Sequence, residues 1–111
     1  MAHSSLQADR SANRLLPMHL GALTVELHLP GCHGLKQKRG RLKPLLAGLH
    51  RHFNVSAAEI DHQDNHHRAV IACVTVSNDA RQVQRVLDGI PGWIESHSPD
   101  LQVIDQQMQL F

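Results

Sequence analysis

The sequence has no tyrosine, and only Phe53, Trp93 and Phe111 of its 111 residues are aromatic. Two cysteines, Cys32 and Cys73, are too few for a disulfide scaffold or a CxxC metal site. No apolar run approaches the ~20 residues that a membrane span needs. The first residues also lack the apolar segment of a secretory signal. We therefore expect a cytoplasmic protein that is not bound to a membrane.

The formal charge of +1 hides an uneven distribution. Residues 1–54 carry eight Lys or Arg against Asp9 and Glu26, whereas residues 55–111 carry three Arg against eight carboxylates. Residues 1–17 are polar and end in a proline, so we interpret them as a disordered leader. The remaining residues, 18–111, show neither repeats nor a linker and form one predicted domain.

Hydrophobic periodicity predicts the order β-α-β-β-α-β. Alternating leucines and valine over residues 20–29 predict a strand, and a leucine stripe from Leu42 to Phe53 predicts a helix that Pro44 bends but does not split. Further strands are predicted at Val55–Ile60, Ala69–Ser77 and Leu101–Phe111. A second helix follows the capping residues 77–79 and is broken near residues 89–92.

Two β-α-β halves of this kind predict an α+β, ferredoxin-like sandwich: a four-stranded antiparallel sheet with both helices on one face. The other face is then open to solvent. On its central strands we expect Thr24, Glu26, His28, Ile71, Cys73 and Thr75. Since none of these carries an aromatic ring of the kind on which RNA-recognition sheets stack bases, base stacking on the sheet is not predicted.

The strongest functional signal is a run of cations in the first helix without any acid between residues 27 and 58. A solvated face normally mixes charges of both signs, so this stripe predicts contact with the phosphates of a nucleic acid. The alternative is a merely solubilising face. The predicted phosphate contacts are Lys36, Lys38, Arg39, Arg41 and Lys43.

The polar segment at residues 61–67 combines imidazoles and carboxylates. Its spacing fits no closed metal motif, and Asp and Asn commonly stabilise turns. We therefore predict no metal there and interpret Asp61, His62, Gln63 and Asp64 as an interaction loop.

The turn at residues 30–34 precedes the first helix, where backbone N–H groups favour anions and Cys32 would gain reactivity. The alternative is a tight turn around a small, semi-buried side chain. A copper chaperone of this fold needs a second cysteine here, and an acylphosphatase-like enzyme needs an arginine inside the loop. Because both are missing, we predict no catalytic residue and no cofactor.

Several blocks of the sequence resemble the YlxP-like family (domain of unknown function 503), small bacterial proteins of unknown function. The resemblance covers roughly residues 18–111. The blocks are Pro30-Gly31-Cys32, Leu35-Lys36-Gln37-Lys38-Arg39, Leu42-Lys43, Phe53-Asn54-Val55-Ser56, Glu59-Ile60-Asp61-His62-Gln63-Asp64, Arg68-Ala69 and Val76-Ser77-Asn78-Asp79.

The resemblance implies a ferredoxin-like fold. The family's genes often lie beside those for transcription elongation, translation initiation and ribosome maturation, which implies an RNA or ribosome context. Gly34 stands where the family tends to have serine, and Gly40 replaces a better helix former.

From these observations we expect a non-enzymatic module that contacts structured RNA or the ribosome through its first helix. The first alternative is a protein-interaction or self-association module, in which the basic half of one copy meets the acidic half of another. The second is a metal-binding or phosphate-handling enzyme.

Overall fold

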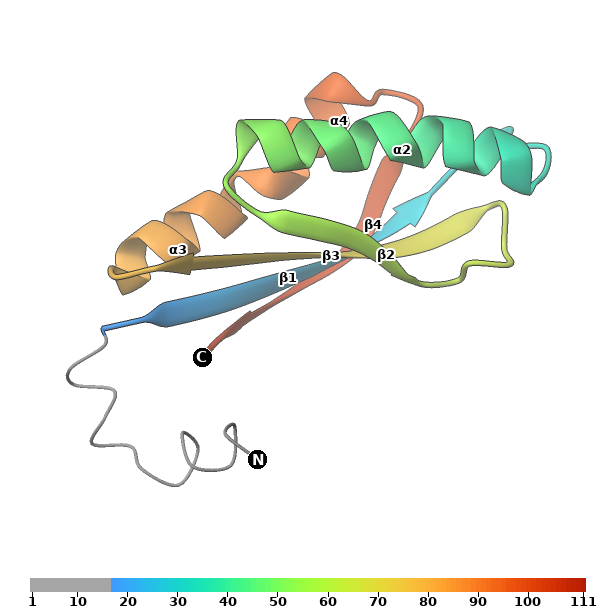
Figure 1. The fold of residues 1–111 in the computed structure, drawn as a ribbon. Coiled ribbons are helices and arrows are strands. Elements are labelled where there is room, and N and C mark those ends of the chain that lie inside the picture. Colours follow the sequence, from blue (N-terminus) through green and yellow to red (C-terminus); the bar gives the residue numbers. More distant parts are fainter. Residues whose placement is uncertain (1–16) are drawn as a thin grey trace.

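Four antiparallel strands form one sheet in the order β2-β3-β1-β4, and the helices lie on one of its faces (Figure 1). The structure, a computed structural model, describes residues 17–111. The predicted α+β, ferredoxin-like fold is confirmed. The elements in chain order are β1 (His19–His28), α2 (Leu35–His52), β2 (Ser56–Asp61), β3 (Arg68–Ser77), α3 (Ala80–Asp88), α4 (Ile90–His97) and β4 (Gln102–Leu110).

The core lies between the sheet and the helices. Alternate residues of β1 and β3 face it, because side chains of a strand point to opposite faces of the sheet. The helices close it with a stripe of aliphatic residues at helical spacing. The buried members include Leu23, Val25, Leu27, Ala69, Ile71, Leu42, Leu45, Leu49, Val83, Leu87, Ile90 and Ile94.

α2 is one continuous helix of 18 residues although Pro44 lies inside it. Proline has no N–H, so it cannot donate to the carbonyl of Gly40 one turn earlier. Both residues are exposed, and water can reach this gap in the hydrogen-bond ladder. The expectation that the proline does not divide the helix is confirmed.

The second predicted helix is divided into α3 and α4. Asp79 caps α3 by accepting a hydrogen bond from the Arg81 N–H at 2.9 Å. Gly89 separates the two helices, and Pro91 lies in the first turn of α4, where its missing N–H costs no helical hydrogen bond. The predicted break near residues 89–92 is confirmed.

The open face of the sheet differs from the prediction on β3. Ile71, Cys73 and Thr75 are buried beneath the helices instead of lying on the open face. The pairing of Leu23 with Cys73 and of Thr24 with Ala72 places Val70, Ala72 and Val74 on the open side. A shift of one residue in the assumed register exchanges the two faces of a strand.

The predicted leader over residues 1–17 falls, except for Pro17, outside the described residues. Within residues 17–111, no helix has the length and apolar character that a membrane crossing requires.

Two glycines of α2 should respond in opposite ways to alanine. A Cβ at Gly40 meets nothing within 4 Å, so Gly40→Ala should stabilise the fold by about 0.5–1 kcal/mol through helix propensity. A Cβ at Gly48 would lie 2.8 Å from Cη2 of Trp93, so Gly48→Ala should destabilise by about 1–3 kcal/mol. Urea unfolding of both variants measures the difference, and equal effects would contradict this packing.

Candidate nucleic-acid interface

α2 presents a row of exposed cations to solvent. Lys36, Arg39 and Lys43 are all exposed. At 100° per residue they fall on one side of the helix, over an axial distance of about 10 Å. Arg51 is exposed near the end of the same helix. We call Lys36, Arg39, Lys43 and Arg51 the cationic face; it includes three of the five predicted phosphate contacts.

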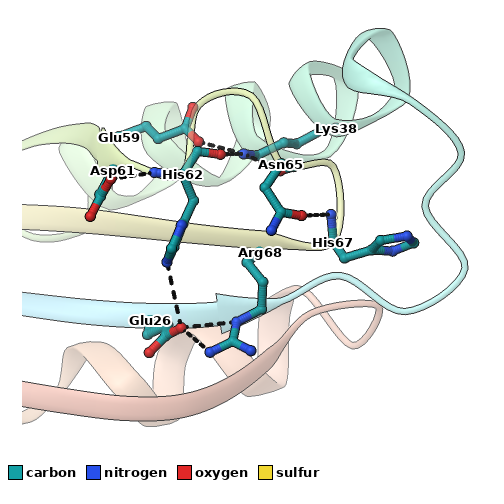
Figure 2. A network of polar contacts seen from close by, with 8 residues as sticks. All are labelled: Glu26, Lys38, Glu59, Asp61, His62, Asn65, His67 and Arg68. Carbon is teal, nitrogen blue, oxygen red and sulfur yellow. Dashed lines mark hydrogen bonds and ion pairs between the residues drawn. The ribbon is translucent and has the colours of Figure 1, made fainter.

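Lys38 does not belong to the cationic face, and its prediction as a phosphate contact is wrong. Its side chain is only 2% exposed and points toward the β2–β3 hairpin (Figure 2). Nζ donates to the carbonyl oxygens of His62 at 2.6 Å and Asn65 at 2.7 Å, and it lies 2.7 Å from Oε2 of Glu59. Two carbonyl oxygens therefore accept hydrogen bonds from the ammonium group, and the Glu59 carboxylate neutralises its charge as an ion pair.

Arg41 is also engaged within the protein. Its Nη1 donates to the carbonyl of Pro30 at 2.9 Å, and its Nε lies 3.6 Å from Oδ2 of Asp100. Its side chain retains 18% exposure. Arg41 therefore ties the turn before α2 to the turn before β4 and is a weaker candidate for phosphate contact than its neighbours.

The predicted interaction loop is built around the ammonium of Lys38. His62 adopts a left-handed backbone conformation with φ of 62°, which is uncommon for a residue with a side chain. Its N–H donates to Oδ1 of Asp61 at 2.8 Å, and its carbonyl accepts from both Lys38 and the Asn65 N–H. The backbone carbonyls of the loop thus bind the Lys38 ammonium. The side chains of Asp61, Gln63 and Asp64 remain exposed.

The same loop reaches the open face of the sheet through its histidine ring. Nε2 of His62 lies 3.8 Å from Oε2 of Glu26 on β1. Arg68 on β3 donates to the same oxygen through Nε at 2.9 Å and also through Nη2 (Figure 2). A polar network therefore runs from α2, around the end of the hairpin, to the open face.

The turn at residues 30–34 fits the alternative of a tight turn around a small, buried side chain. Cys32 is fully buried, and its Sγ lies 3.6 Å from the carbonyl oxygen of Gly34. Gly34 occupies the cap position with φ of 104° and supplies no side-chain hydrogen bond. Across residues 17–111, no three His, Cys, Asp or Glu side chains lie together as a metal site would require.

Sequence reasoning missed an aromatic cluster between α2 and α4. Trp93 stacks with His97 at a centroid distance of 4.4 Å and with His52 at 5.4 Å. Phe53 meets the same indole edge-on at 5.7 Å. His52 and His97 lie far apart in sequence, and only the packing of the two helices brings them together around Trp93.

Sequence comparison places the chain among known proteins. The family described as "Protein of unknown function (DUF503)" matches residues 20–108, from the start of β1 nearly to the end of β4. The chain belongs to the DUF503 family. One DUF503 relative, "Uncharacterized protein YlxP" of Bacillus subtilis (strain 168), is 36% identical over 77 residues, which are 69% of this chain and 84% of the relative. The predicted resemblance is confirmed.

In this DUF503 domain, Lys38 should contribute to stability far more than its neighbour on the exposed side. Lys38→Met keeps the side-chain length but removes the cation from the Glu59 carboxylate and one hydrogen bond from each of the His62 and Asn65 carbonyls. Removing one member of a buried ion pair typically costs about 3 kcal/mol or more. Chemical denaturation should show this loss, whereas the matched variant Lys36→Met should change stability by less than about 0.5 kcal/mol.

A second comparison separates charge from packing. The double variant Lys38→Met with Glu59→Leu removes both charges, and it should recover part of the stability that Lys38→Met loses. Equal stabilities of Lys38→Met and Lys36→Met would contradict the buried position of Lys38.

Cys73 should be unreactive in the folded protein. Burial raises the pKa of its thiol from 9.0 to about 11, because a thiolate cannot be solvated there. A folded pKa above the unfolded value stabilises the fold at lower pH, and this contribution is lost as pH rises from 9 toward 11. Unfolding free energy should therefore fall more steeply across this window in the wild type than in Cys73→Ala. If unfolding free energy depended on pH in the same way in both proteins, the raised pKa of Cys73 would be contradicted.

Proposed function

We propose that this domain binds structured RNA, free or within the ribosome, through the cationic face of α2. The observation that carries the proposal is a division among the cations of one helix. Lys38 and Arg41 are paired inside the protein, whereas the four members of the cationic face have no ion pair within residues 17–111. Their charge is therefore available to an external anion.

α2 contains no acid anywhere in its 18 residues. A polyanion that binds here meets no repulsive carboxylate on the helix itself. Each phosphate that a lysine or arginine neutralises releases condensed counterions, which makes binding strongly salt-dependent. Four contacts correspond to a slope of about −3 to −4 in a plot of log affinity against log salt.

The open sheet face supports backbone contact over sheet stacking. Its central positions on β1 and β3 are Thr24, Glu26, Val70, Ala72 and Val74, with His28 and Arg68 at one end. No aromatic side chain of the kind used by RNA-recognition sheets is among them. Binding through α2 should therefore depend mainly on the shape and phosphates of the RNA.

The proposal predicts that reversing two charges on the cationic face abolishes most binding. Arg39→Glu with Lys43→Glu should weaken binding to a structured RNA hairpin and to small ribosomal subunits by at least about tenfold. It should also reduce the salt slope by roughly two, one for each lost phosphate contact. Filter binding and co-sedimentation across a salt series measure both quantities.

The matched control changes the same net charge on another helix. Arg81→Glu with Arg85→Glu alters two exposed arginines of α3 and should leave RNA binding within about twofold, since charges remote from a contact act weakly at physiological salt. Equal losses in the two double variants would contradict the proposed face. Salt-sensitive self-association in sedimentation, unaffected by RNA, would favour an interface between copies instead.

A further inference from the structure

A groove of about 400 Å³ runs between α2 and α4, on the flank of the cationic face. Its lining includes Gly40, Pro44, Gly48 and Arg51 of α2 and Trp93 and His97 of α4, and we call it the α2–α4 groove. The volume lies within the range of small-molecule sites. Gly40 and Gly48 line the groove without side chains, and Gly48 is the one that lies against the indole.

One wall of the groove is a stack of rings. The planes of Trp93 and His97 are inclined by only 17° at a centroid distance of 4.4 Å. Trp93 is half-buried, so part of its surface faces the groove. Stacked aromatic side chains are surfaces on which a planar base can continue the stack, whatever the identity of the base.

The opposite wall of the groove supplies a cation and a hydrogen-bond acceptor. Arg51 lines the groove, is exposed and has no ion pair within the described part of the chain. Because Pro44 cannot donate to the Gly40 carbonyl, that oxygen lacks its usual helical partner. Asp100 also lines the groove, but the Arg41 guanidinium at 3.6 Å offsets its charge. The groove therefore offers a cation and a carbonyl acceptor beside aromatic rings.

Gly40 has no packing reason to be glycine. Its Cβ position is open, and glycine within a helix costs roughly 0.5–1 kcal/mol relative to alanine. What the missing side chain does is keep one end of the α2–α4 groove clear. The buried indole N–H of Trp93 also has no acceptor within residues 17–111, so a small ring movement toward a ligand oxygen would satisfy it.

We infer that the α2–α4 groove binds one unpaired nucleotide of an RNA strand, with its base against Trp93 and His97 and its phosphate on Arg51. The inference rests on the proposed function and deepens it. The cationic face would hold the backbone of a structured RNA, and the groove would take a base that projects from a loop or bulge. Single-stranded loops are where side chains can reach and stack on bases.

Trp93 reports directly on this site, since it is the only tryptophan and the chain has no tyrosine. A short adenine RNA oligonucleotide should quench its fluorescence, and an abasic oligonucleotide of equal length should bind about fivefold to a hundredfold more weakly without quenching. Gly40→Leu obstructs the Gly40 end of the groove while keeping every cation, so it should weaken the quenching and the preference for bases.

Two controls make the result decisive. Gln84→Leu places the same side chain on α3 and should behave as the wild type, and a structured RNA hairpin without unpaired bases should bind Gly40→Leu normally. If both oligonucleotides bind alike and the fluorescence is unchanged, or if Gly40→Leu is quenched as the wild type is, the groove inference is overturned while the proposed function stands. If no RNA binds even at low salt, the proposed function itself fails.

Discussion

The ammonium group of Lys38 is the contact on which the arrangement of this domain depends. It is buried where α2 crosses the β2–β3 hairpin, and it meets one carboxylate and two backbone carbonyls within 2.7 Å. An unpaired charge in this position would be costly, so the helix, the edge strand and the loop must be placed together. The left-handed conformation of His62 follows, because it turns a carbonyl toward the lysine.

This placement divides the cations of α2 into a group that is paired within the protein and a group that is exposed to solvent. Lys38 and Arg41 hold the hairpin and the flanking turns, and the rotation of the helix that buries Lys38 turns Lys36, Arg39 and Lys43 toward solvent. The same rotation sets Gly48 against Trp93 and opens the α2–α4 groove beside Arg51. The burial of Lys38 and the exposure of the cationic face are thus consequences of one helix orientation.

Most of the fold was predictable from the sequence, because the periods of the hydrophobic residues fix the order and the approximate bounds of the elements. The burial of Lys38 was predictable too, because it lies four residues before Leu42 and seven before Leu45, in the core stripe. Glu59 lies two residues after Ala57 and therefore on the same, core-facing side of β2. The prediction of which β3 residues lie on the open face was wrong, because a continuous run of apolar residues does not reveal which alternate residues face the core. The stack of His52, Trp93 and His97 depends on how α4 leaves the break at Gly89, which no local pattern specifies.

All three lysines of the chain lie in α2, so acetylation mapped by mass spectrometry tests the central claim, the division between structural and available cations, in one experiment. In the folded protein alone, Lys36 and Lys43 should react readily and Lys38 should react only after unfolding. Addition of structured RNA should protect Lys36 and Lys43 and leave Lys38 as unreactive as before. Rapid acetylation of Lys38 in the folded protein, or unchanged reactivity of Lys36 and Lys43 with bound RNA, would contradict the account.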